Sequence, residues 1–469
     1  MKIKLGMNKA SMRDVAAYCL GELYDFTGEI GCEFEYVCTD SREADENTMF
    51  VATRGERVDG HDYIIKAIES GCRCILCEYV PTNIAGKSVA YVVVENSIDA
   101  FSDCAKGYRG ASYMPTVAIT GSVGKTTTKE LCAAILTRHF KTYYTEGNFN
   151  SVIGMPMSLM AAEGDCTAAV FEMGMSGFGE IRRMSRAASP AIAMVTNVGS
   201  SHLEYLGTRE NIARAKLEIG EGIIDGGFLL LNGDEPLLWD HYSDRYETVY
   251  VGLGEKCGFN IRNVRVESDG TYFDMSVPRG YFYDLKIPLI GAHFAYNAAF
   301  AVTAAYLLGV DQKDIRAGLA SYVPSNMRMN IYEKNGFTVI ADCYNAAPES
   351  MRGAINTLTA LSVSGRRVAV LGDMKELGRD SDEMHKDIGR YLQKKGIDLL
   401  FTLGESGSLI ADAAVESGID ASLVFSVKEA DGKEELAALI KANTKGGDAL
   451  LFKASRSMRL EEVIEKIFD

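Results

Sequence analysis

The sequence predicts an α/β protein with three domains, of which the second and third are built around parallel sheets. The chain has 469 residues, and at roughly 150 residues per domain this length favours about three domains. From about residue 114 onward, apolar β-branched segments alternate with helical stretches, a pattern typical of βαβ units. The glycine-rich stretch AITGSVGKTTTKE, residues 118–130, follows one of these strands and indicates a phosphate-binding loop.

The composition favours a globular protein that binds small molecules. Hydrophobic residues make up 47% of the chain and charged residues 24%, enough apolar surface for several packed cores. The net charge of −15 disfavours nucleic acid and anionic membrane surfaces as partners. The first residues lack the pattern of a signal peptide, and no apolar run reaches the roughly 18 residues of a membrane span. We therefore expect a cytoplasmic protein without membrane insertion.

The cysteines are expected to be reduced thiols. The chain has 11 of them and no export signal, which disfavours a disulfide framework. Cys72, Cys74 and Cys77 lie close together, but no second Cys or His pair follows that would complete a metal site. We interpret this stretch as a buried strand with small apolar side chains rather than as a metal site.

Shifts in the sequence pattern place the domain boundaries. Residues 1–112 alternate short helices and strands and form a small α/β domain. Residues 113–325 begin with the strand TVAIT, and residues 326–469 restart the α/β pattern with FTVIADCYN, RRVAVLGDM, LLFTLGE and ALLFKAS. We expect three successive domains with these bounds.

Three predicted strands of the second domain each end in a polar or glycine-containing turn. TVAIT is followed by residues 121–127, AAVFEM ends near Glu172, and AIAMVTN leads to Asn197 and His202. Ligands of open parallel sheets gather where the strands end. These three turns are therefore expected to face one crevice.

The segment TGSVGKTTT has the ingredients of a phosphate loop, although it lacks the first glycine of the usual G-x-x-x-x-G-K spacing. Gly121 and Gly124 allow the backbone N–H groups to turn inward, and the next helix offers its positive end. Lys125 adds a point charge, and Thr126 or Thr127 offers a hydroxyl ligand for Mg²⁺. The ordinary alternative is a tight turn with a surface lysine.

Three further residues are candidates because of where they stand relative to these strands. Glu172, if buried at a strand end, needs a partner for its charge, and a magnesium ion would supply one. Taken singly, His202 has the simpler explanation of a structural histidine, and Lys216 that of a solvated helix residue.

Several motifs in order closely resemble those of the Mur ligase family. TDSR with FVATRGERVDGHDYI is similar to its uridine-nucleotide domain, and TGSVGKTTTKE, GNFNSVIGMP, EMGMSGFGEI and TNVGSSHLEYLGTRENIARAKLEI are similar to its ATPase domain. GAHFAYNAAFAV, DCYNAAPESM, VLGDMKELG and KASRSMRLEEVI complete the order. The resemblance implies a uridine-nucleotide N-terminal domain, a central phosphate-loop ATPase domain with a parallel sheet, and a Rossmann-like C-terminal domain.

The resemblance also implies a reaction. ATP would phosphorylate the terminal carboxylate of UDP-N-acetylmuramoyl-tripeptide, and the amine of D-alanyl-D-alanine would attack the acyl phosphate to give UDP-N-acetylmuramoyl-pentapeptide, ADP and phosphate. The chain would act as a monomer. Diaminopimelate and lysine both stay open as the third residue of the tripeptide.

Site residues follow from the resemblance, position by position. Thr126 and Glu172 would hold one magnesium ion, while His202 and a carbamylated Lys216 would hold a second, with Lys125 offsetting phosphoryl charge. An unmodified lysine would repel the metal, whereas a carbamate offers a carboxylate-like ligand. The other implied residues are Gly121, Ser122, Gly124, Thr127, His293, Asn297, Arg328 and Asp342 for ATP, and Thr39, Asp40, Ser41, Arg42, Asn148, Asn150, Tyr344 and Asn345 for the other substrates.

The chain departs from the family pattern at three positions. Ala347 replaces an asparagine of the usual NANP sequence, Ala454 replaces a glycine, and Val123 stands where a small polar residue is common. Three other functions stay open: a folylpolyglutamate synthase, a nucleotide-dependent binding protein, and a plain NTPase switch. The first would use folate and glutamate in place of the muramoyl substrates.

Overall fold

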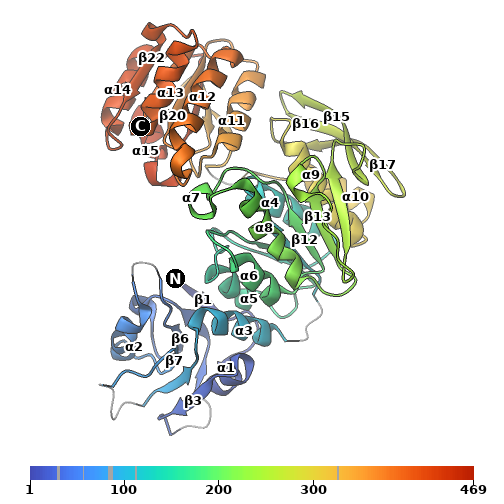
Figure 1. The fold of residues 1–469 in the computed structure, drawn as a ribbon, viewed down its shortest axis with the longest axis vertical. Helices are drawn as coiled ribbons and strands as arrows, with labels where there is room; N and C mark the ends of the chain where they lie inside the picture. The colour runs from blue at the N-terminus through green and yellow to red at the C-terminus, as the bar shows by residue number, and fades with distance from the viewer. Residues whose placement is uncertain (29–31, 56–57, 83–87, 111–113, 325–326, 469) are drawn as a thin grey trace.

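The computed structural model describes residues 1–28, 32–55, 58–82, 88–110, 114–324 and 327–468. Three large sheets follow one another along the described chain, each with helices packed against it, which confirms the predicted α/β class (Figure 1). The N-terminal and C-terminal sheets lie at opposite ends of the molecule, with the central sheet between them. Both predicted domain boundaries fall within residues 111–113 and 325–326, which lie outside the described residues.

The N-terminal sheet is mainly parallel in its middle and has an antiparallel strand at each edge. Its strands, in spatial order, are β1 (Lys2–Lys4), β5 (Tyr36–Cys38), β6 (Thr48–Val51), β7 (Cys74–Cys77), β8 (Ala90–Val93) and β3 (Glu22–Asp25). A small separate pair is formed by β2 (Ala10–Ser11) and β4 (Glu33–Phe34), and the helices are α1 (Met12–Cys19), α2 (Ile64–Glu69) and α3 (Ser97–Arg109). The cysteine-rich stretch contains the fully buried strand β7, as the sequence predicts.

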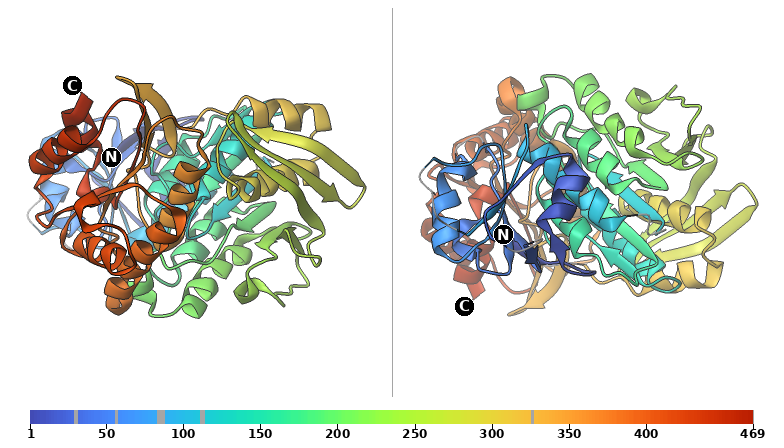
Figure 2. Two further views of the ribbon diagram at one scale, coloured as in Figure 1. Left: turned by 90° about the horizontal axis from the view of Figure 1, so that it is seen from above. Right: turned by 90° about the horizontal axis from the view of Figure 1, so that it is seen from below.

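The central sheet has nine strands. In spatial order they are β10 (Thr142–Tyr144), β11 (Ala168–Glu172), β9 (Thr116–Thr120), β12 (Ile192–Val195), β13 (Phe228–Asn232), β14 (Glu247–Gly252), β15 (Phe259–Glu267), β16 (Gly270–Val277) and β17 (Gly280–Ile287). The three strands predicted to surround the crevice are neighbours, in the order β11, β9, β12, and all run parallel. The antiparallel meander β15–β17, which the sequence pattern did not identify, extends the sheet away from the other domains (Figure 2).

Seven helices among the described residues belong to the central domain: α4 (Lys125–Leu136), α5 (Gly154–Ala161), α6 (Glu180–Ala188), α7 (Leu203–Leu206), α8 (Arg209–Leu217), α9 (Phe294–Leu307) and α10 (Gln312–Ala320). Helix α9, FAYNAAFAVTAAYL, is apolar on all sides and almost wholly buried, as expected of a core helix. It packs against α4, which follows the phosphate loop. The helix that follows the phosphate loop is thus packed against the buried core helix of the domain.

The C-terminal sheet runs β18 (Asn330–Lys334), β19 (Phe337–Ala341), β23 (Ala449–Lys453), β20 (Arg367–Gly372), β21 (Leu399–Leu403) and β22 (Val424–Val427). Only β18 is antiparallel, so the sheet is Rossmann-like. Its helices are α11 (Pro348–Ala360), α12 (Ser381–Lys395), α13 (Glu405–Glu416), α14 (Lys433–Asn443) and α15 (Glu461–Phe468). All four strands that the sequence predicts here are present.

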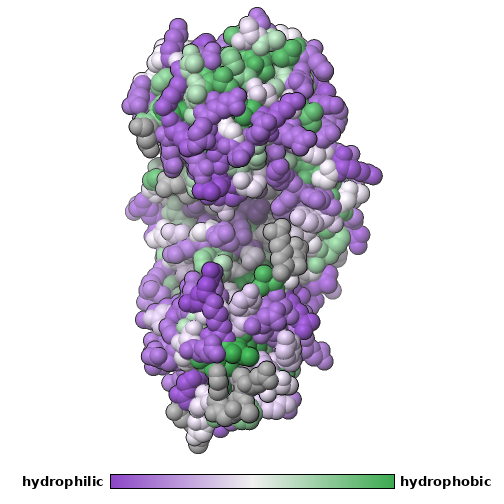
Figure 3. Space-filling view, turned by 90° about the vertical axis from the view of Figure 1, so that its left-hand side faces the viewer, coloured by the Kyte–Doolittle hydropathy of each residue, from purple (hydrophilic) through white to green (hydrophobic). Residues whose placement is uncertain are grey.

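The surface in Figure 3 is mostly hydrophilic, with hydrophobic residues in scattered patches. None of the helices in the described ranges is both long enough and apolar enough to cross a membrane.

A close approach between α4 and α10 gives a test of the core. A Cβ built on Gly318 would lie 2.5 Å from the Ile135 Cα, so even a methyl group forces the two helices apart. Gly318→Ala should lower the free energy of unfolding by about 1–3 kcal/mol, measured by urea denaturation. Gly258→Ala is the control, because a Cβ there meets nothing within 4 Å; equal losses in both variants would contradict the packing.

Candidate active site

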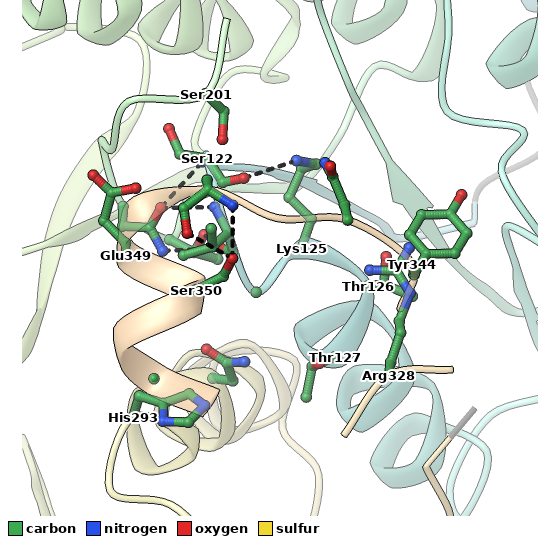
Figure 4. Close-up of a pocket in the computed structure, with 18 of the residues that line it drawn as sticks. Ser122, Lys125, Thr126, Thr127, Ser201, His293, Arg328, Tyr344, Glu349 and Ser350 are labelled. Atoms are coloured by element: carbon green, nitrogen blue, oxygen red, sulfur yellow. Dashed lines mark hydrogen bonds between the residues drawn. The ribbon is translucent and has the colours of Figure 1, made fainter. Parts of the chain in front are cut away.

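A cavity of about 560 Å³ lies between the central and C-terminal domains. The phosphate loop, the ends of β11 and β12 and the start of α9 form its central-domain wall. The opposite wall comes from residues 328–329, 342–354 and Lys453. Figure 4 shows side chains of α4 and α11 facing each other across this space. Two domains must therefore be present for the site to be complete.

The phosphate loop needs its glycines. Gly124 has φ +80° and stands immediately before α4, in a conformation that other residues rarely adopt. A Cβ on Gly121 would lie only 2.0 Å from the Thr196 Oγ1. The loop can therefore pack directly on the end of β12 and lead the chain into a helix whose N-terminus faces the cavity.

The segment after β12 holds the loop in place. The Asn197 Oδ1 accepts hydrogen bonds from the backbone N–H groups of Ser122 and Val123, at 3.1 and 3.0 Å. In turn, the Asn197 Nδ2 donates to the Val123 carbonyl at 2.8 Å, and the Gly199 N–H donates to the Ser122 Oγ at 2.8 Å. These hydrogen bonds join the segments that follow β9 and β12, which are neighbouring strands of the sheet.

Lys125 folds back over the loop. Its Nζ donates to the carbonyls of Gly121 and Ser122, at 2.8 and 3.4 Å. Part of the side chain remains exposed in the cavity. Desolvation by the surrounding protein lowers the pKa of its amine, whereas the negative charge of Glu172 raises it. The amine therefore lies where an anion on the loop would contact it.

Glu172 is a buried carboxylate that forms no direct ion pair within the described part of the chain. Only 2% of its surface is exposed. Its Oε2 accepts from the Thr126 Oγ1 and its Oε1 from the Asn150 Nδ2, both at 2.7 Å. A hydroxyl, a carboxylate and an amide are hard oxygen-rich groups of the kind that suit Mg²⁺. This donor set fits the magnesium site that the sequence analysis assigned to Thr126 and Glu172.

Lys216 is buried near Lys125 and is not among the residues that line the cavity. It is 1% exposed, and within the described residues no group forms a hydrogen bond or ion pair with its amine. Burial, with the nearby charge of Lys125, lowers its pKa well below the usual value. A neutral amine is the form that reacts with CO₂, so the environment fits a carbamate.

Four more of the predicted residues lie at the start of α9 and on the C-terminal wall of the cavity. The Asn297 side chain lies against the phosphate loop, within 2.8 Å of where a Gly124 Cβ would be. Burial lowers the pKa of His293 to about 4, so its imidazole is neutral near pH 7. Asp342 forms an ion pair with Lys453, whose Nζ also donates to the Asn345 carbonyl at 2.9 Å.

Arg328 and Tyr344 face each other at the edge of the cavity (Figure 4). The Arg328 guanidinium lies 3.8 Å from the centre of the Tyr344 ring, a cation–π contact. Both side chains belong to the C-terminal wall.

The structure brings most of the predicted site residues together but not all. Those that line the cavity are Ser122, Gly124, Lys125, Thr126, Thr127, Asn150, Glu172, His202, His293, Asn297, Arg328, Asp342, Tyr344 and Asn345. Gly121, Lys216 and Asn148 lie outside this lining, and Thr39, Asp40, Ser41 and Arg42 belong to the N-terminal domain. Gly121 carries the loop backbone and Lys216 is packed below it, whereas Asn148 is exposed to solvent.

The TDSR turn forms a compact polar unit. The Asp40 carboxylate accepts from the backbone N–H and the guanidinium of Arg42, which holds its pKa well below the usual range. Arg42 itself is largely exposed. A charged group is thus presented to solvent at the end of β5.

Sequence reasoning missed several lining residues. Asn232 and Lys453 each end a buried strand, a position that could have identified them. Glu349 reaches across from α11, and its Oε1 accepts from the backbone N–H and hydroxyl of Ser200, at 3.1 and 3.0 Å. No sequence pattern signals that contact, because it exists only when the two domains are docked.

Comparisons with known proteins agree across the chain. Residues 33–110 match the Mur ligase family catalytic domain, residues 119–305 the Mur ligase middle domain, and residues 327–456 the Mur ligase glutamate ligase domain. The UDP-N-acetylmuramoyl-tripeptide–D-alanyl-D-alanine ligase of Bacillus subtilis is 36% identical over 92% of this chain and 93% of its own length.

Solved structures are similar over the same extent. A crystal structure of MurF from Acinetobacter baumannii is 28% identical and covers 99% of this chain and 100% of its own, with a TM-score of 0.88. The MurF ligase from Thermotoga maritima in complex with ADP is 30% identical and covers 92% of this chain and 96% of its own, with a TM-score of 0.79. With all three domains matched in order, the chain belongs to the Mur ligase family.

Proposed function

We propose that this protein is an ATP-dependent ligase that joins D-alanyl-D-alanine to UDP-N-acetylmuramoyl-tripeptide, giving UDP-N-acetylmuramoyl-pentapeptide for peptidoglycan precursor synthesis. Relatives of that name match over nearly the full length of the chain. The observation that carries the proposal is the two-walled cavity, in which a phosphate loop faces residues of a separate C-terminal domain. A plain NTPase switch would leave the second wall without a role.

The chemistry of amide formation explains why ATP is needed. A peptide carboxylate is a poor electrophile, and a phosphoryl group converts one of its oxygens into a leaving group. The N–H groups at the start of α4 and the Lys125 amine would offset the charge of the phosphates. The acceptor amine then bonds to the acyl carbon while the carbon–oxygen bond to phosphate breaks.

The hydrogen-bonded pair of Thr126 and Glu172 supports magnesium as the cofactor. Thr126 and Glu172 would hold one ion, and His202 with a carbamylated Lys216 a second. When bound, magnesium neutralises negative charge on the phosphates and on the carboxylate. Within the chain, Asn150 keeps the Glu172 carboxylate oriented toward the cavity through its hydrogen bond to Oε1.

The Lys216 modification follows from its burial. The neutral Nζ would bond to the carbon of CO₂ and release a proton, leaving a carbamate with one negative charge. That charge would need a cation close by, which a magnesium ion held with His202 would supply. The side chain would thus change from a buried amine without a partner into a metal ligand.

The other substrates are assigned to the outer parts of the site. Thr39–Arg42 would contact the uridine diphosphate, and Asn148 and Asn150 the muramoyl peptide. Tyr344 and Asn345, on the C-terminal wall, would contact the dipeptide, with His293, Asn297, Arg328 and Asp342 on ATP. We propose that the protein acts as a monomer and that the reaction takes place in the cytoplasm, since it consumes ATP.

Phosphate release tests the proposed function. Release from ATP should require both UDP-N-acetylmuramoyl-tripeptide and D-alanyl-D-alanine, because the acyl phosphate is consumed only when the acceptor amine is present. Folate plus glutamate should give no release. Turnover with the folate pair alone would move the chain to a folylpolyglutamate synthase, and no turnover with either pair would favour a binding role.

Removal of Lys216 tests the carbamate. Lys216→Ala should lower kcat by more than about 100-fold, since it removes a metal ligand from the reacting phosphate. Acetate or formate should restore part of the activity by occupying the space of the carbamate, whereas bicarbonate should not. Lys313→Ala, at an exposed position of α10, is the control; undiminished turnover of the Lys216 variant would exclude the carbamate.

A further inference from the structure

One contact joins the C-terminal domain to a proposed metal ligand. The Nδ1 atom of His202 lies 2.7 Å from the Oε2 of Glu376, which belongs to the loop between β20 and α12. Nδ1 is buried and, within the described residues, forms no well-aligned hydrogen bond, so the contact with the Glu376 carboxylate is close but not linear. Glu376 is therefore the acceptor within reach of this nitrogen.

Both residues have a positive φ angle, a backbone conformation that residues other than glycine rarely adopt. His202 has φ +66° and Glu376 has φ +64°. Left-handed residues of this kind are uncommon, and their strain persists only where the surrounding structure fixes it. Two such residues meeting across a domain boundary indicate that the contact is held in place by both domains.

The Glu376 loop is clamped within its own domain. The Met374 N–H donates to the buried His385 Nε2 at 2.9 Å, and the Lys375 N–H donates to the Ser455 Oγ at 2.9 Å. The Ser455 N–H in turn donates to the Asp373 carbonyl at 3.0 Å. Glu376 thus extends from a fixed base rather than from a free loop.

The same loop docks on the helix that follows His202. The Glu204 N–H donates to the Glu376 carbonyl at 3.2 Å. A Cβ on Gly378 would lie 3.0 Å from the Glu204 Cα, so the two backbones are nearly in contact. The carboxylate reaches His202 because this backbone contact brings the loop to α7.

The energy of the contact between His202 and Glu376 does not explain its presence. The side chain of Glu376 is 46% exposed and that of His202 is 23% exposed, and partly exposed pairs contribute only about 0–1 kcal/mol to stability. A contact that adds little stability, yet joins two residues with uncommon backbone conformations, is better explained by what it does to the imidazole.

We infer that Glu376 is a positioning residue for His202. By accepting from Nδ1–H it holds the imidazole in the tautomer whose Nε2 carries a free lone pair, the form needed to bind a metal ion. Because the acceptor comes from the C-terminal domain, the ligand is prepared only when that domain is docked. The inference rests on the proposed function in one respect, that His202 binds the metal.

The test compares two substitutions that differ in reach. Glu376→Gln keeps an acceptor oxygen at the same distance. Glu376→Asn is one methylene shorter and tolerates the left-handed backbone, so it should relieve strain rather than disturb the fold. Glu383→Gln, at an exposed ion pair on α12, controls for the loss of a carboxylate from the same domain.

The first readout is the tautomer of His202, measured by ¹⁵N NMR of histidine-labelled full-length protein. The chain has only 6 histidines, and His202→Asn identifies the resonances of interest. The wild type, Glu376→Gln and Glu383→Gln should have Nδ1 protonated. Glu376→Asn should show a mixture with the Nε2–H form, and a tautomer unchanged by Glu376→Asn would overturn the inference.

The second readout is Mn²⁺ affinity, measured by electron paramagnetic resonance without turnover. Glu376→Asn should weaken the second site by about 10-fold, the lower end for groups that orient a metal ligand, while Glu376→Gln and the control stay near wild type. Equal weakening by the Gln and Asn variants would overturn the inference. If His202→Asn leaves Mn²⁺ binding intact, the proposed metal role of His202 fails, while the tautomer measurement still decides whether Glu376 fixes the ring.

Discussion

Burial of charge at the floor of the cavity is the constraint on which the site depends. Glu172 and Lys216 are both almost completely enclosed, and within the described residues neither forms an ion pair. Isolated buried charges are unfavourable unless they are neutralised, paired or bound to metal. Burial lowers the pKa of Lys216, which favours its neutral form. The Glu172 carboxylate accepts hydrogen bonds from Thr126 and Asn150. Both arrangements suit a site that cations and phosphates complete.

The order of strands in the central sheet brings the residues of the site together. Because β11, β9 and β12 are parallel neighbours, their carboxyl ends deliver Glu172, the phosphate loop and Asn197 to one edge. Asn197 forms hydrogen bonds with the phosphate loop, and α9 packs against α4, the helix that follows this loop. The C-terminal domain closes the opposite side, where Glu349 and Glu376 contact the segment after β12.

The sequence predicted the parts of the site that lie at strand ends. Glu172 and the phosphate loop could be placed together because each follows a strand that its own apolar residues identify. In a parallel sheet the ends of such strands lie at the same edge. The resemblance to a family added Lys216, whose burial no helical pattern reveals. Contacts such as those of Glu349 and Glu376 could not be predicted, since they depend on how two domains dock. The antiparallel meander β15–β17 was also missed, and the predicted domain bounds stay a prediction.

The central claim is that Lys216 becomes a carbamate beside a metal ion, and ¹³C NMR of the protein equilibrated with ¹³CO₂ tests it most directly. The account predicts one carbamate resonance that is absent from a Lys216→Ala variant and is broadened when Mn²⁺ is added. Because Mn²⁺ broadens only nearby nuclei, the same experiment places the metal. A fully active protein without a carbamate resonance, or with one that Mn²⁺ leaves sharp, would contradict the account.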